Sequence, residues 1–150
     1  MSRETLAAVD AEDLDVISAR LQDAVARVGD LVWLPKQRRF AGLFNRFKWE
    51  NARKDGDVRV RAGLHFDAVL AVQSHNVLRG APDAVVSLLA IRFTPKSSLE
   101  GGGEDPGGTV HLEFAGGGGI RLVVECIDAG LSDISGDWAA LGRPDHEVEG

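Results

Sequence analysis

Hydrophobic and polar positions alternate with a period of two along residues 109–127, on either side of a run of glycines. Alternation around a glycine loop is typical of a β-hairpin with one buried face. If Phe114 pairs with Ile120, the apolar side chains of both strands share that face, and Glu113 lies opposite Arg121 on the other. The sequence therefore predicts a hairpin that forms one wall of the hydrophobic core.

A second pattern, near the N-terminus, has helical spacing and a strong start signal. Asp10 is a good N-cap, and Asp13 lies three residues on, in the position of a capping-box carboxylate. Apolar residues then recur at helical spacing as far as residue 28, and Gly29 suits a C-terminal cap. The pattern predicts a helix over residues 11–28, preceded by a short edge strand at residues 4–9.

Most of the remaining chain has the composition of strands separated by turns. Gly42 predicts a bulge or bend in its strand, and an Asp-Gly pair at 55–56 marks a hairpin turn. We expect residues 96–108 to be a mobile glycine-rich loop and residues 143–150 to be a frayed acidic tail. Apolar spacing favours a short helix over 128–141. Besides the hairpin, the expected strands are residues 31–34, 39–50, 58–66, 68–72 and 85–93.

These elements predict a single α+β domain over residues 1–150, without internal repeats or a dividing linker. Strands joined by short turns pair antiparallel with their neighbours in sequence. We therefore expect a curved antiparallel meander or a partly open barrel of about seven strands, with the one N-terminal helix packed on it. A pleckstrin-homology-like roll is compatible with this pattern, as an analogy at the level of the fold.

Composition places the chain among ordinary globular proteins, with 44% hydrophobic and 27% charged residues. No apolar run approaches the length of a membrane span, and the first residues lack the apolar core of a signal peptide. The only cysteine, Cys126, cannot form an internal disulfide, and its place in the alternation points it inward as a small hydrophobe. We therefore expect a cytoplasmic protein that does not enter the membrane.

The net charge of −6 is unevenly distributed. Residues 36–61 contain nine basic and three acidic residues, a balance of +6, so the remainder carries −12. Strands that interleave arginines with aromatic residues can bind nucleic acid, although an acidic protein with a pI near 5.2 repels a polyanion. A solvated charged face explains the same residues. The candidate ligand-binding or nucleic-acid-binding residues are Arg38, Arg39, Arg46, Lys48, Arg59 and Arg61.

Candidate chemistry is sparse, and we predict no catalytic residue, no metal site and no cofactor. The glycines at 116–119 precede a strand and no Lys-Ser/Thr pair, which favours a hairpin loop over a phosphate cradle. His111 and Glu113 share a face of their strand, a spacing that can hold a metal but is also typical of a solvated polar face. The other histidines, His65, His75 and His146, lie far apart in sequence.

Nine short motifs, taken in order, resemble one known family. They are LQDAV (21–25), VGD (28–30), WLP (33–35), RF (39–40), NRF (45–47), WE (49–50), GGGIRL (117–122), ECI (125–127) and RPDH (143–146). This order resembles domain of unknown function 2948, a small family of uncharacterised proteins typical of alphaproteobacteria. The resemblance implies a cytoplasmic bacterial protein of this size, and it carries no known activity, ligand or catalytic residue.

Three functions remain open. The leading hypothesis is a non-catalytic cytoplasmic binding or accessory domain that acts through a protein partner or a small ligand, with a homodimer as one possible state. The second is a nucleic-acid-binding protein that uses residues 36–61. The third is a small hydrolase or metal enzyme, which requires a concave site that holds His65 or His111 with a carboxylate.

Overall fold

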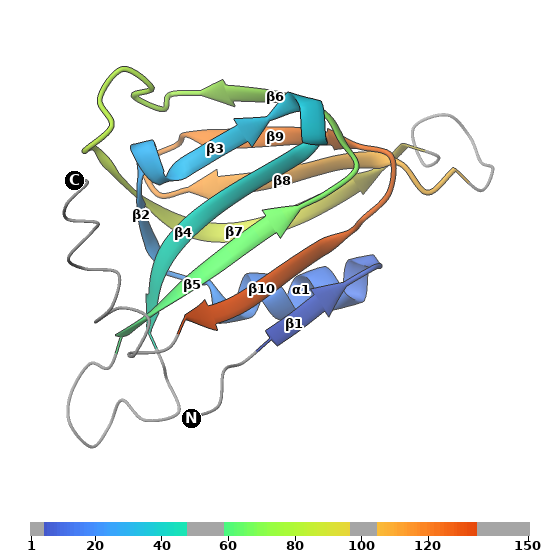
Figure 1. Ribbon diagram of the computed structural model, residues 1–150, viewed down its shortest axis with the longest axis horizontal. Coiled ribbons are helices and arrows are strands. Elements are labelled where there is room, and N and C mark those ends of the chain that lie inside the picture. Colours follow the sequence, from blue (N-terminus) through green and yellow to red (C-terminus); the bar gives the residue numbers. More distant parts are fainter. Residues whose placement is uncertain (1–4, 48–58, 97–104, 135–150) are drawn as a thin grey trace.

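The computed structural model describes residues 5–47, 59–96 and 105–134, and these ranges form one curved antiparallel sheet with a single α-helix (Figure 1). The predicted α+β class is confirmed. The sheet is open and has ten strands, more than the seven or so expected. The elements are β1 (Thr5–Ala8), α1 (Ala11–Arg20), β2 (Val25–Arg27), β3 (Leu31–Leu34), β4 (Arg39–Phe47), β5 (Arg59–Phe66), β6 (Val69–His75), β7 (Val85–Pro95), β8 (Gly108–Phe114), β9 (Gly119–Val124) and β10 (Ala129–Ile134), with short 3-10 helices η1 (Val28–Asp30) and η2 (Pro35–Gln37).

The strand order is β1-β10-β5-β4-β2-β7-β8-β9-β6, and β3 pairs with β4 beside this path. The expected simple meander holds only for β3–β4–β5 and β7–β8–β9. Between these two units lies the three-residue strand β2, whose Val25 pairs with both Asn45 of β4 and Ser87 of β7. Strands distant in sequence, including β10 with β5 and β6 with β9, therefore build much of the sheet.

Helix α1 begins where the sequence predicts and ends earlier. The Asp10 carboxylate accepts the Asp13 N–H at 2.8 Å, as predicted for the N-cap, and the Asp13 carboxylate accepts the N–H of Val9, one residue before the N-cap, at 3.1 Å. Past the helix, Asp23 adopts a φ of 69° and its N–H donates to the Leu88 carbonyl at 2.8 Å. This bond draws the chain onto β7, and the residues that follow form β2 instead of the predicted continuation of the helix.

The predicted hairpin exists as β8 and β9, with a register two residues away from the expected one. The Phe114 N–H donates to the Gly118 carbonyl at 2.9 Å, which leaves a three-residue tip and pairs Leu112 with Ile120. An offset of two residues leaves every side chain on the same face of the sheet, so the apolar side chains of the hairpin are buried as predicted. Its buried members are Val110, Leu112, Phe114, Ile120, Leu122 and Val124.

The polar face of the hairpin differs from the expectation because of this offset. His111, and not Glu113, lies opposite Arg121. Glu113 instead accepts from the Nε of Arg92 on β7 at 3.0 Å. Cys126 follows the end of β9 and is half-buried, so the predicted alternation does not extend to it.

A strand, β10, stands where the sequence predicts a short helix. Leu131 of β10 pairs with Leu6 of β1 and Leu64 of β5. Its neighbour Gly130 lies under the ring of His65, where an added Cβ would come within 2.5 Å. The segments 97–104 of the predicted loop, 135–141 of the predicted helix and 143–150 of the predicted tail lie outside the described residues, as does the predicted turn at 55–56.

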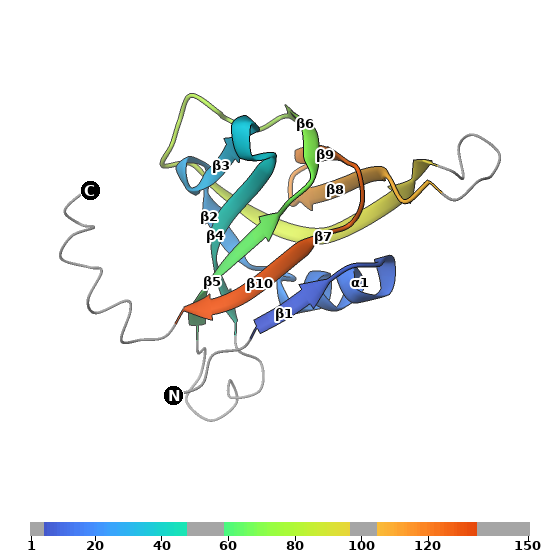
Figure 2. The same cartoon turned by 45° about the vertical axis from the view of Figure 1, so that its right-hand side comes forward.

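The predicted bulge at Gly42 does not form, since the pairing of β4 with β5 is continuous from Phe40 to Phe47. Gly42 is instead a position of close packing, where an added Cβ would lie 2.8 Å from Leu31 Cδ2. The core lies between the inner face of the sheet and α1, which runs beside β1 and β7 (Figure 2). Leu14 and Ile17 are the buried residues of that helix.

Candidate functional site

The two strand edges of β3 and β6 face each other without pairing. Among the described strands, β3 pairs with β4 alone and β6 with β9 alone. Residues of both strands line one cavity of about 410 Å³ (strand positions in Figure 1). We call this cavity the seam, because it occupies the place where pairing of β3 with β6 would otherwise close the sheet.

The floor of the seam is hydrophobic core. Val28, Phe40 and Ile120 lie there and are almost completely buried. Leu31 and Trp33 line the β3 side, since they alternate with outward-facing residues and point to the inner face of the sheet. Val72 of β6 and Val77, just beyond β6, line the opposite side.

Backbone hydrogen bonds join the two sides at one end of the seam. The Val69 N–H, at the start of β6, donates to the Arg38 carbonyl at 3.0 Å. The Arg38 guanidinium also lies 3.2 Å from the Glu125 carboxylate. The φ of 54° at Arg38 turns the chain from η2 into β4 at this point. The sheet is therefore connected across this end even though β3 and β6 do not pair.

At the other end, residues 76–84 cross from β6 to η1. The Gly29 N–H donates to the Pro82 carbonyl at 2.9 Å, and the Val28 N–H donates to the Ala84 carbonyl at 2.8 Å. Gly29, predicted as a helix cap, is needed here for close approach, because an added Cβ would lie 2.9 Å from the Pro82 side chain. These bonds place residues 76–84 beside the mouth of the seam.

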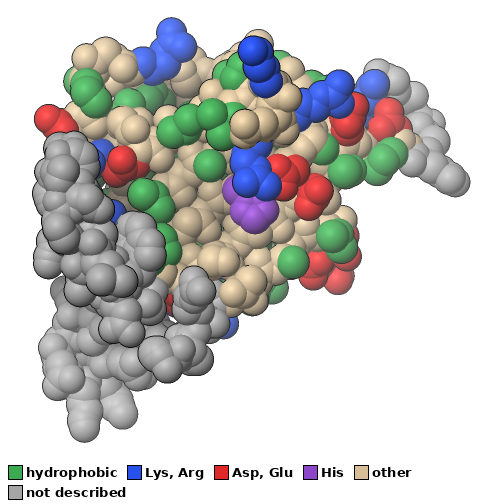
Figure 3. Space-filling view, in the orientation of Figure 1, with side chains coloured by type: hydrophobic (Ala, Val, Ile, Leu, Met, Phe, Trp, Pro, Cys, Tyr) green, Lys and Arg blue, Asp and Glu red, His purple; other side chains and the backbone are tan. Residues whose placement is uncertain are grey.

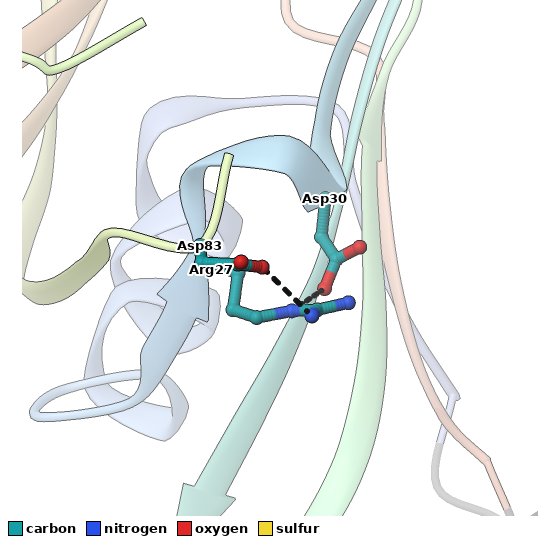
Figure 4. Close-up of polar contacts among 3 residues, drawn as sticks. All are labelled: Arg27, Asp30 and Asp83. Carbon is teal, nitrogen blue, oxygen red and sulfur yellow. Dashed lines mark hydrogen bonds and ion pairs between the residues drawn. The ribbon is translucent and has the colours of Figure 1, made fainter. Parts of the chain in front are cut away.

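An ion-pair cluster lies on the outside of the same crossing. Arg27, at the end of β2, lies 3.3 Å from the Asp30 carboxylate and 3.4 Å from the Asp83 carboxylate (Figure 4). All three side chains are at the surface, so each pair adds little stability by itself. Their shared guanidinium nevertheless links η1 to the segment 76–84 from the outside.

The hairpin tip holds the start of that segment. The ring Nε2 of His75 lies 3.1 Å from the Gly117 carbonyl oxygen. Asn76 has a φ of 52°, and its carbonyl packs so closely on Gly118 that an added Cβ would lie 2.6 Å away. Gly117 itself has a φ of 99°, which glycine adopts without strain. The glycines of the tip therefore serve its shape and its contact with residues 75–76.

The mouth of the seam carries polar side chains without partners. Within the described ranges, the side chains of Ser74 and Arg79 make no hydrogen bond or ion pair. The Trp33 indole N–H is likewise without an acceptor in the part of the chain that the structure describes. Arg79 is the one charged residue among those described that line the cavity. The seam thus combines an apolar floor with free donors at its opening.

The basic residues proposed from the sequence are distributed over different surroundings. Arg38 lies at the end of the seam and is paired with Glu125, as described above. Arg39 is exposed and forms two hydrogen bonds to Asp67, at 2.7 and 3.2 Å. These bonds, together with the negative charge of Asp67, raise the pKa of Arg39 above its ordinary value. Both guanidinium groups therefore already have carboxylate partners.

Arg46 lies on the inner face and is buried, with two hydrogen bonds to Asp133 at 2.9 and 2.7 Å. Arg61 is exposed on the outer face of β5. Lys48 and the side chain of Arg59 lie outside the described residues. The described candidates do not form one surface, and Figure 3 shows basic and acidic side chains next to one another on the face it displays. Nucleic-acid binding stays a prediction.

The histidines proposed for a metal or hydrolytic site are separated. His65 lies 3.6 Å from Asp67, and His111 Nε2 lies 3.3 Å from the Thr94 hydroxyl. Within the described residues no three potential metal ligands come together. A second cavity, of about 380 Å³ at the hairpin tip, is lined by residues that include His75, His111 and Glu113, of which Glu113 is paired with Arg92. His146 lies outside the described residues.

Sequence reasoning did not find the seam, although it noted most of its residues. Trp33, Phe40 and Ile120 follow the alternation of core residues, and the free edges that expose them result from pairings between distant strands. Arg79 stands alone in a turn and carries no local signal. None of the helical segments among the described residues has the length and hydropathy of a membrane span.

The structure defines an α+β protein with one open antiparallel sheet, a single described α-helix and a cavity at the unpaired edges. A family model described as "Protein of unknown function (DUF2948)" matches residues 5–146. The chain therefore belongs to the DUF2948 family, as the sequence motifs indicated. No curated protein matches the chain, and no solved structure matches it.

Proposed function

We propose that this protein is a non-catalytic cytoplasmic binding domain that takes up a small molecule in the seam. The observation that carries the proposal is the cavity of about 410 Å³ between two unpaired strand edges. Its volume lies within the range of about 300–1,000 Å³ that is typical of ligand pockets. An apolar floor with a few polar groups at the opening is the composition that such pockets share.

The frame around the cavity supports the same proposal. Hydrogen bonds close both ends, from Val69 to Arg38 at one end and from Gly29 to Pro82 at the other. The two edges are therefore held apart at a fixed separation before any ligand arrives. A preformed site binds without the entropic cost of ordering its own walls.

The test is binding of the neutral apolar dye N-phenyl-1-naphthylamine, measured by its fluorescence increase on transfer from water to an apolar site. We expect saturable binding of one dye per chain. Ser74→Trp places a large side chain in the seam and should weaken binding by about tenfold or more. The matched control is Ala71→Trp, on the same strand but exposed on the outer face, which should bind as the wild type does.

Two results would overturn the proposal. One is the absence of saturable dye binding to the wild-type protein. The other is equal weakening by the Ser74→Trp and Ala71→Trp substitutions, which would show that the dye responds to loosening of β6 rather than to occupation of the seam. Urea unfolding of each variant establishes that it is folded during the titration.

A further inference from the structure

We infer that the ligand of the seam is a small amphipathic anion, with an apolar body on the cavity floor and a carboxylate at Arg79. This inference deepens the proposed function and rests on it. It concerns the chemical class of the ligand, for which the charges and donors around the mouth of the seam are informative.

The charge around the mouth is unbalanced. Arg27 and Arg38, at the two ends of the seam, are each paired with carboxylates. Arg79 lies on the segment 76–84 beside the mouth, and within the described ranges no acidic residue lines the cavity with it. A guanidinium beside an apolar cavity attracts an anion more strongly than it would in open water, because the cavity wall lowers the local dielectric.

The neighbouring polar groups favour the same charge. The Ser74 hydroxyl and the Trp33 indole N–H can both donate hydrogen bonds, and both are free within the described residues. An arginine can grip both oxygens of a carboxylate at once, which leaves these donors for the remaining lone pairs. A ligand with a positive head group would meet donors and a like charge instead.

The rest of the cavity indicates the chemistry of the body of the ligand, the part that lies away from Arg79. Phe40 and Ile120 form a buried floor, with Trp33 and Leu31 along one side. Such a surface gains most from an apolar or aromatic body that displaces water from it. A purely polar anion such as inorganic phosphate would leave this surface uncovered. The combined site therefore fits an aromatic or aliphatic carboxylate.

The experiment compares two probes of the same size, 2-naphthoate and 2-naphthamide, by isothermal titration calorimetry. We expect the wild-type protein to bind the carboxylate about tenfold more tightly than the amide, as a charge-assisted hydrogen bond would give. Arg79→Gln should abolish this preference, so that the two probes bind with about equal affinity. The control variant Arg121→Gln removes the same charge from the outer face of β9 and should retain the preference.

The possible failures are distinguishable. If the amide and the neutral dye bind in the seam but the carboxylate has no advantage, or if Arg79→Gln retains the advantage, this inference is wrong and the proposed function stands. If Arg121→Gln loses the preference as fully as Arg79→Gln, the preference reflects net charge and the inference is also wrong. If none of the three probes binds, the proposed function itself fails.

Discussion

Two arginines on strand β4 form the same kind of bidentate pair in opposite surroundings. Arg39 donates from Nε and Nη2 to Asp67 at 2.7 and 3.2 Å, with 44% and 28% of the two side chains exposed. Arg46 donates from the same two atoms to Asp133 at 2.9 and 2.7 Å, with 1% and 9% exposed. Positions 39 and 46 are an odd number of residues apart, so a regular strand places them on opposite faces.

The comparison shows that position on the strand, more than chemistry, decides what each pair contributes. A solvent-exposed pair is worth about 0–1 kcal/mol, because water competes for both groups. A buried pair has lost its hydration, so removal of either partner leaves a desolvated charge at a cost of about 3–5 kcal/mol. The inner pair also spans β5, which lies between β4 and β10 in the sheet, and so ties three strands together.

The largest effect is expected from Asp133→Asn, which removes the buried negative charge and retains the shape of the side chain. Arg46 then keeps a buried positive charge without the Asp133 carboxylate, and we expect a loss of about 3–5 kcal/mol in the free energy of unfolding. Urea denaturation followed by circular dichroism measures this loss. The double variant Arg46→Met/Asp133→Leu removes both charges and should be far closer to the wild type than the single variant.

A smaller effect is expected from Arg46→Lys, which retains the positive charge but replaces the planar guanidinium by an ammonium. One ammonium does not reproduce the two parallel N–H···O bonds that the guanidinium makes to Asp133, and we expect a loss of about 1–3 kcal/mol. The matched substitution Arg39→Lys at the surface should change stability by less than about 0.5 kcal/mol. Equal effects of the two substitutions in thermal unfolding would contradict the proposed difference between the faces.

Asp67→Asn tests the surface pair directly. Because water replaces the lost carboxylate, we expect a decrease in stability of no more than about 1 kcal/mol. Differential scanning calorimetry should detect at most a shift of a few degrees in the midpoint. A loss as large as that of Asp133→Asn would mean that the exposed pair fastens β4 to the end of β5 in a way that its solvent exposure does not explain.

The smallest expected effect is a difference in how salt changes the coupling free energy of the two ion pairs. Double-mutant cycles for Arg39 with Asp67, and for Arg46 with Asp133, give the coupling free energy of each pair. Raising sodium chloride from about 0.05 M to about 0.5 M should reduce the surface coupling by a few tenths of a kcal/mol and leave the buried coupling nearly unchanged. Equal reductions would show that solvent ions reach the inner pair.

The sequence contained a signal that Arg46 faces the core, but Arg46 was grouped with the other basic residues of 36–61 as part of a charged region. Alternation places Phe40 and Phe44 on one face of their strand. Arg46, two residues after Phe44, lies on the same face. A charged residue at a core position needs a partner, and Asp133 supplies it from β10. That partner could not be predicted, because the spacing of apolar residues near it fitted a helix.

Strands with a clear alternation of apolar and polar residues could be predicted from the sequence. Their pairing registers and their partners from distant parts of the chain could not. Residues 31–34 form β3 as predicted, whereas Val25 fits a helical stripe as well as a strand. Contacts with β4 and β7 decide in favour of the strand. The hairpin register depends on how many residues the tip holds, which glycine-rich sequence leaves undetermined. The seam, which depends on the non-neighbouring partners of β3 and β6, was beyond local reasoning for the same reason.

The position of β10 has a consequence for synthesis on the ribosome. Its residues pair with β5 on one side and with Thr5–Ala8 on the other, so the first strand of the sheet has no place until the last described strand has been translated. Until then a nascent chain exposes an edge of β5 to other polypeptides, and Arg46 lacks the Asp133 carboxylate. Arrival of residues 129–134 therefore covers that edge and brings the Asp133 carboxylate to Arg46 in the same late step.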